Sequence, residues 1–176
     1  MATSVAIVPL GLRSYSAGVS ALVLAAAATD VFTITGFNGG IVKVTKITIG
    51  GVATAALTGG INLIKRTTAN TAGTATSILG VLRDNIVSEP SKALVQAYTA
   101  NPTVGTATAP TGGNLGIMVL PIGTSAAPVS PLQIGLGDSG LLYPTLRSAN
   151  DVLAINMAGA TIVGGLLTVN IEWTEE

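Results

Sequence analysis

The stretch Gly137-Asp138-Ser139-Gly140 has the same sequence as the loop that holds the nucleophile of a serine protease. A serine hydroxyl reacts only when a neighbouring base takes its proton, and the protease triad uses histidine for that step. The chain contains no histidine, and none of its lysines lies at a recognised spacing from Ser139. We therefore interpret the stretch as a turn between strands and the chain as not an enzyme. A Ser–Lys hydrolase at Ser139 is the weakest of three hypotheses.

Carboxylates are the second set of residues that could do chemistry. They are Asp30, Asp84, Glu89, Asp138, Asp151, Glu172, Glu175 and Glu176. A glycosidase needs two such groups converging in a cleft, and sugar clefts usually also hold aromatic side chains, which make up 3% of this chain. No run matches a calcium-binding loop of the EF-hand type. We interpret the carboxylates as solvated loop acids and strand-end charges, and we predict no metal and no cofactor.

Basic residues gather on two predicted strands, where Lys43, Lys46, Lys65 and Arg66 could align on one side of a sheet. They could dock onto an acidic partner, or they could be edge-strand charges that block unwanted pairing. Both interpretations stay open. The candidate partner-binding residues combine part of this set with the N-terminal segment: Val5, Ile7, Val8, Leu10, Arg13, Lys65 and Arg66.

The composition points to a protein that hides much of its surface in an assembly. Charged residues are 9% of the 176 residues, whereas about 25% is typical of soluble domains. The longest apolar run, residues 20–28, is much shorter than the roughly 20 residues that span a bilayer. The 8 basic and 8 acidic residues cancel, and no basic run provides the positive footprint that nucleic acid requires. We therefore predict neither a membrane nor a nucleic-acid partner.

Short β-rich runs separated by turn residues predict an all-β fold. About nine or ten runs occur, which is typical of a sandwich or barrel and not of alternating strands and helices. Asn38-Gly39 lies between two of them and predicts a hairpin. In the second run, Val42 and Val44 have one parity, whereas Ile47 and Ile49 have the other. A bulge near Thr45-Lys46 would restore the phase.

Two further expectations concern the ends of the chain. Residues 1–16 lack periodicity and predict an extended arm, followed by a single antiparallel β-sandwich domain over residues 17–176. The run at 20–28 could be a strand or a short helix, because alanine favours helix. Trp173 alternates with Val169 and Ile171, which favours a place in the core over an oligomer interface.

Several phrases resemble a family of small structural proteins from tailed bacteriophages. They occur in order from about Thr29 onward: "TDVFTITG" (29–36), "IVKVTKITIGGVATAA" (41–56), "LIKRTTANTAGTAT" (63–76), "AYTANPTVGT" (97–106) and "RSANDVLAINMAGATIVGGLLTVNIEWTEE" (147–176). Residues 78–92 depart from the pattern, and the first 28 residues lie outside it.

This resemblance implies a jelly-roll-like sandwich that serves as a decoration (cement) protein on a phage capsid. It implies a virion location on the capsid surface, the major capsid protein as partner, and assembly as a homotrimer. The family has no catalytic residues to transfer. The alternative is a tail-fibre or host-adhesion domain that binds a cell-surface glycan, for which Tyr98 and Tyr143 are the aromatic residues near loops.

Overall fold

The computed structural model describes residues 12–83, 89–108, 113–137, 143–162 and 164–176. Within these ranges the chain forms strands and no helix. The strands are β1 (Arg13–Val23), β2 (Ala28–Thr35), β3 (Val42–Ala53), β4 (Leu57–Arg66), β5 (Thr74–Ile78), β6 (Val81–Leu82), β7 (Leu94–Ala100), β8 (Asn114–Thr124), β9 (Leu132–Gly135), β10 (Thr145–Leu146), β11 (Val152–Ala160) and β12 (Leu166–Glu175).

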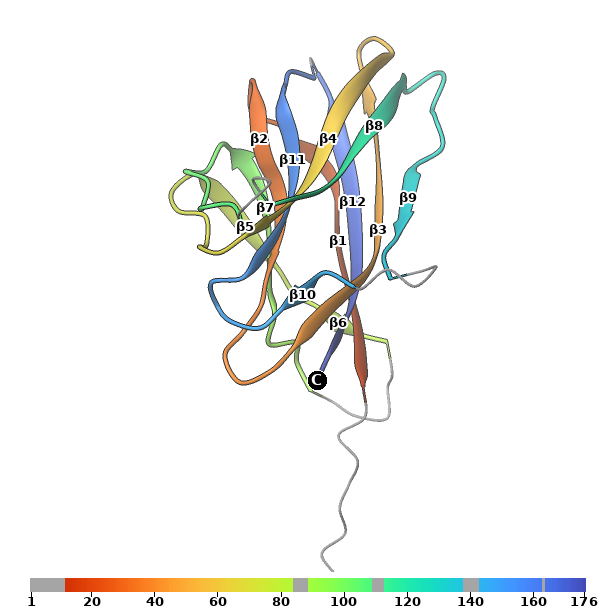
Figure 1. Ribbon diagram of the computed structural model, residues 1–176. Helices are drawn as coiled ribbons and strands as arrows, with labels where there is room; N and C mark the ends of the chain where they lie inside the picture. Colours follow the sequence, from red (N-terminus) through yellow and green to blue (C-terminus); the bar gives the residue numbers. More distant parts are fainter. Residues whose placement is uncertain (1–11, 84–88, 109–112, 138–142, 163) are drawn as a thin grey trace, which may run out of the picture.

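The strands form one long sheet that curls into two layers (Figure 1). The order is β5-β7-β2-β11-β4-β8-β3-β12-β1-β6, and β9 and β10 also pair with β3. The strand pairs are antiparallel except for β3 and β8, which run parallel where Val52–Ala53 meets Gly123–Thr124. At this corner β8 leaves the first layer and joins the second. The predicted all-β, jelly-roll-like sandwich is confirmed, with this one parallel pair as an exception.

The bulge predicted in β3 is also confirmed. Lys46 is paired with Glu172 and Val44 with Trp173, so Thr45 is the extra residue on the β3 side. The inserted residue shifts the alternation by one. As a result Val42, Val44, Ile47 and Ile49 are all completely buried, although their positions in the sequence have opposite parity.

The hairpin predicted at Asn38-Gly39 is wrong, because β2 and β3 do not pair. β2 lies between β7 and β11 in the first layer, whereas β3 lies beside β12 in the second. Gly39 has a positive φ of 85°, but Asn38 does not, so the two positive φ values of a type I′ turn are missing. The residues between β2 and β3 therefore cross from the first layer to the second. Each of the two strands pairs with strands that are distant from it in the sequence.

The last residues of the segment predicted to be an extended arm belong to a strand. β1 begins at Arg13, and residues 13–16 pair with Glu172–Glu175 at the end of β12. Residues 1–11 lie outside the described residues. The alanine-rich run at 20–28 contains the end of β1, a turn with Ala27 at φ 50°, and the start of β2, and no helix.

The core lies between the two layers and is built from alternate residues of the long strands. Trp173 is completely buried, as predicted, and its ring stacks on Tyr15 with 5.7 Å between centroids. Phe32 and Ile155 face this core from the other layer. The sandwich therefore has a continuous apolar interior that fixes the positions of the polar groups described next.

Candidate functional site

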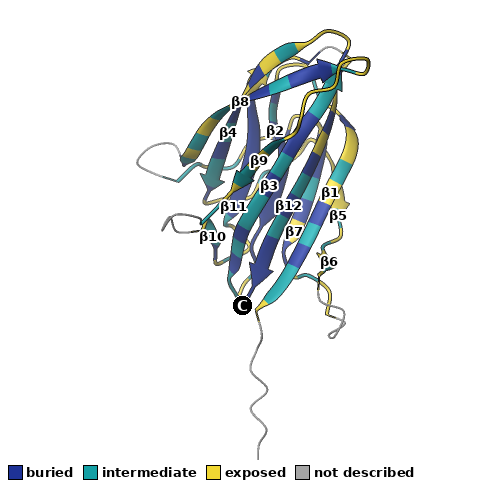
Figure 2. Ribbon diagram, turned by 90° about the vertical axis from the view of Figure 1, so that its right-hand side faces the viewer, coloured by how far each residue is buried: buried dark blue, intermediate teal, exposed yellow. Residues whose placement is uncertain are grey.

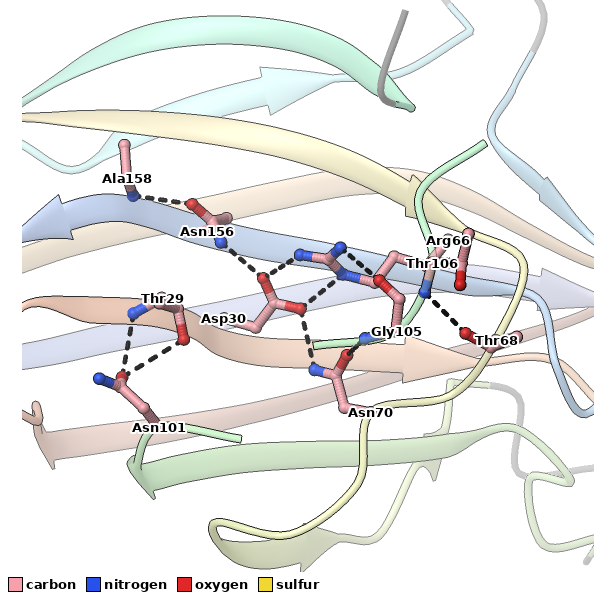
Figure 3. A network of polar contacts seen from close by, with 10 residues as sticks. All are labelled: Thr29, Asp30, Arg66, Thr68, Asn70, Asn101, Gly105, Thr106, Asn156 and Ala158. Carbon is pink, nitrogen blue, oxygen red and sulfur yellow. Dashed lines mark hydrogen bonds and ion pairs between the residues drawn. The ribbon is translucent and has the colours of Figure 1, made fainter. Parts of the chain in front are cut away.

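A buried carboxylate is the centre of a network of polar contacts (Figure 3). Asp30 on β2 accepts hydrogen bonds of 2.7 Å each from Nε and Nη2 of Arg66, the last residue of β4. Nδ2 of Asn156 on β11 donates to it at 2.7 Å, and Nδ2 of Asn70 at 2.8 Å. The charge of Asp30 is therefore matched by one cation and spread over four donors.

The same network ties two loops to the sheet. Nη1 of Arg66 donates to the carbonyl oxygen of Gly105 at 2.8 Å, and the Gly105 N–H donates to Oδ1 of Asn70 at 2.9 Å. A Cβ atom at residue 105 would overlap the carbonyl oxygen of Thr68, so only glycine fits there. The loop after β4 and the loop after β7 therefore meet at Arg66.

This arrangement has no group ready to take or give a proton to a substrate. Both carboxylate oxygens of Asp30 are engaged by donors, and the Arg66 guanidinium donates hydrogen bonds to Asp30 and to Gly105. The geometry suits a structural role, in which a buried ion pair holds loops in one arrangement.

The structure places three of the predicted partner-binding residues, Arg13, Lys65 and Arg66, in different surroundings. Arg66 is 4% exposed, so it cannot serve as a docking charge. Lys65 points away from the network and donates to the carbonyl oxygen of Thr145 at 2.8 Å. Arg13 forms an ion pair with Glu89 at the start of β1 and is not brought together with Lys65. Val5, Ile7, Val8 and Leu10 lie outside the described residues.

The interpretation of the carboxylates as solvated loop acids and strand-end charges is wrong for Asp30, which is buried inside β2, whereas Glu175 is a strand-end residue of β12 but is buried as well. Asp30 is 1% exposed and Glu175 is 7% exposed. Glu175 accepts hydrogen bonds from Nε1 of Trp173 at 2.9 Å and from Oγ of Ser91 at 2.6 Å. The backbone N–H groups of Lys92 and Ala93 also donate to it at 3.1 Å each. One available signal was that Asp30 is the one charged residue of its strand, in which the other residues are apolar or threonine.

Of the protease-like stretch, only Gly137 lies within the described residues. Its φ of 83° suits a turn. Asp138, Ser139 and Gly140 lie outside the described residues, so the interpretation of Ser139 stays a prediction. Of the two tyrosines that could serve a glycan site, Tyr98 is buried and Tyr143 is 39% exposed.

A row of exposed apolar side chains on β8 is the most unusual surface feature. Leu115, Ile117 and Val119 are 51%, 75% and 64% exposed, and they alternate with residues that turn toward the core. We call these three residues the β8 ridge. Residues 114–124 contain no charged side chain. Figure 2 faces the side of the sandwich on which β8, β9 and β3 lie.

A pocket of about 430 Å³ lies at the start of the β8 ridge. Its apolar lining includes Leu115, Leu136, Tyr143 and Pro144. Lys65 also lines this pocket. The pocket therefore combines apolar walls with a single cation, although that cation is already bonded to Thr145.

No group of three or more potential metal-ligating side chains occurs among the described residues. No helix in the described part of the chain could cross a membrane. Comparison of the chain with protein-family models, with curated proteins and with solved structures finds no match. The fold and its surface therefore define the class as a charge-poor, jelly-roll-like β-sandwich with an exposed apolar strand.

Proposed function

We propose that the chain is a structural virion protein that decorates the outer surface of a tailed-phage capsid. The β8 ridge on a sandwich with very few charges is the observation that supports this most directly. Exposed apolar patches on a folded domain mark interaction surfaces. The collinear phrases from Thr29 onward add the expected family, and the jelly-roll-like sandwich agrees with it.

The proposed mechanism is the bridging of neighbouring capsid subunits by burial of apolar surface. Burial stabilises by roughly 25 cal/mol per Å² of apolar area before the costs of association are subtracted. A decoration protein is present in many copies, so a modest gain at each contact reinforces the whole shell. The N-terminal arm adds a strand to the sheet edge of a neighbouring molecule. The protein acts as a homo-oligomer, which we expect to be a trimer, and it has no catalytic step.

The buried polar groups support this proposal because they form hydrogen bonds with one another inside the domain. Arg66 and Asp30 satisfy each other, and Glu175 is engaged by Trp173 and the segment at 91–93. Such groups rigidify a domain without offering a reactive site. A rigid domain with an apolar surface suits a cement role better than an enzymatic one.

Electron cryomicroscopy of intact particles of the phage that encodes this chain tests the proposal. We expect density of a jelly-roll-like sandwich on the outside of the head, in contact with the major capsid protein. Density on the tail would replace the proposal with the host-adhesion alternative. Absence of the chain from purified particles, checked by mass spectrometry, would exclude both.

A further inference from the structure

Among the described residues, no strand lies beside most of the β8 edge that faces away from β4. Residues from Asn114 to Ile122 pair with β4 on one side, and only Gly123–Thr124 pair with β3 on the other. Within the described residues no other strand pairs with this edge. β9, which lies across from it, pairs only with β3. The sandwich is therefore open between β8 and β9.

Apolar side chains border this opening on both sides. Met118 on β8 and Ile134 and Leu136 at β9 are only partly buried, although they pack against the core. The β8 ridge is more exposed still. Natural edge strands are usually protected by charges, by proline or by shortness. β8 has none of these protections between Leu115 and Leu120, whereas β5 presents short polar residues at another edge.

The chain itself contains a segment with the chemistry of a missing strand. Residues 2–12 are uncharged, and the first charged residue is Arg13. Residues 3–10 include Val5, Ile7 and Val8, which are β-branched and favour strands. Eight residues in a strand extend about 26 Å, which matches the length of the free β8 edge at about 3.3 Å per residue. Pro9 lacks an N–H group, which an outermost strand tolerates.

The point where this segment joins β1 indicates that the strand added to β8 comes from a second copy of the chain. Four strands, β1, β12, β3 and β10, lie side by side at the end of the sandwich that contains Arg13. Arg13 pairs with Glu175, Glu175 pairs with Val42, and Val42 pairs with Leu146. A segment that stayed with its own sandwich would have to cross these strand ends, roughly 14 Å at the usual strand spacing. That crossing would use about four residues. Residues 9–12 would then be used for the crossing, and Leu10 would not lie beside β8.

We propose that residues 3–10 of one copy add a strand to the free edge of β8 in a second copy. The added strand covers Met118 and the half-buried residues of β9, and it gives the unpaired backbone groups of β8 their partners. A contact of this kind is heterologous, because one copy donates the segment and the next accepts it. Repeated around a rotation axis it closes a ring. The inference deepens the role that the proposed function gives to the N-terminal arm. It concerns two copies of this chain and needs no capsid, so its failure would remove that role of the arm and leave the location on the capsid surface to the test by electron cryomicroscopy.

Chemical cross-linking tests the pairing directly, because the chain has no cysteine of its own. One preparation has the change Ile7→Cys, and a second, enlarged by a tag, has Ile117→Cys. The two are mixed and treated with a short bis-maleimide. We expect a mixed product containing one copy of each. The matched control replaces Ile117→Cys by Leu79→Cys, since Leu79 is 88% exposed but lies between β5 and β6. The control should give about tenfold less mixed product.

Two further variants separate loss of pairing from loss of folding. Deletion of residues 2–10 and the change Ile117→Lys should each yield a monomer in sedimentation velocity, while thermal unfolding stays cooperative. A full-length chain that is monomeric would overturn the proposal, and so would a deletion variant that assembles like the full chain. A chain carrying both Ile7→Cys and Ile117→Cys that links only within itself would show that the segment stays with its own sandwich. Dominant linkage between two Ile117→Cys copies would show edge-to-edge pairing instead.

Discussion

Arg66 donates two hydrogen bonds of 2.7 Å to the carboxylate of Asp30, and both side chains are almost completely buried. The two residues come from strands that do not touch, since β11 lies between β2 and β4. Their pairing therefore links three strands and, through Asn70 and Gly105, two loops. Removing either charge leaves the other without compensation in the interior.

We predict that Arg66→Met lowers the free energy of unfolding by about 3–5 kcal/mol, the usual result of leaving one member of a buried pair uncompensated. Urea unfolding monitored by Trp173 fluorescence measures it. Arg83→Met is the matched control, because Arg83 pairs with Glu172 but is more than half exposed. That change should cost less than about 1 kcal/mol. Equal losses in the two variants would contradict the structural role of Arg66.

Deletion of Thr45 should destabilise the protein much more than Thr45→Ala. Without the extra residue, Val42 and Val44 would turn to the outer face of β3, at a cost of roughly 3 kcal/mol for two valines. Thr45→Ala removes only the hydrogen bond from Oγ1 to the carbonyl oxygen of Glu172, worth about 1 kcal/mol. Differential scanning calorimetry of the two variants checks the difference. Similar melting temperatures would show that the bulge does not set the phase.

Alkaline pH should weaken the protein through Tyr15. Burial raises the pKa of its hydroxyl above the ordinary value of 10.0, the carboxylate of Glu175 raises it further, and Arg13 partly opposes this. The unfolded chain therefore loses this proton at a lower pH than the folded protein. The stabilisation is fully present below pH 10 and is lost as the pH rises through the folded-state pKa.

Comparison of the native chain with Tyr15→Phe measures this effect. The urea midpoints of the two proteins should keep a constant difference from pH 7 to 9. Above pH 10 the native chain should lose stability relative to Tyr15→Phe, which has no hydroxyl to ionise. Parallel curves up to pH 11 would argue against a raised pKa.

Glycine should have opposite effects at two alanines of β11. Ala158 has a φ of 53°, which strains any residue that has a Cβ atom, so Ala158→Gly should stabilise by about 0.5–1 kcal/mol. Ala154 lies in the middle of the strand and is completely buried, so Ala154→Gly should destabilise by about 1 kcal/mol. Urea unfolding of both variants gives the signs. A loss in both would mean that the backbone at Ala158 is not strained.

Local patterns in the sequence were enough to predict the fold class, most strand positions and the bulge at Thr45. They failed where distant segments decide the outcome. Asn38-Gly39 has the composition of a hairpin turn, but β11 and β12 separate the two strands into different layers. Alternation alone cannot choose between a neighbour 5 residues away and one more than 100 residues away.

The buried ion pair shows the same limit on a smaller scale. Arg66 follows Lys65 in a strand, and nothing local distinguishes the buried cation from the one near the surface. The difference comes from Asp30, which lies 36 residues earlier. The β8 ridge was equally hard to foresee, since alternating apolar residues usually indicate the buried face of a strand. In β8 the residues that alternate with the β8 ridge face the core, and the ridge itself lies on the surface.

The pairing of early strands with the last two long strands has a consequence for synthesis. β1 and β3 pair with β12, and β2 and β4 pair with β11. In a chain still growing on the ribosome, strands β1 to β4 therefore lack their partners β11 and β12 until residues 152–175 have emerged. Contacts so far apart in sequence slow folding and expose unpaired strands in the meantime. Completion of the sandwich depends on its final stretch, so a chain stopped before Val152 would leave β1 and β3 without β12, and β2 and β4 without β11.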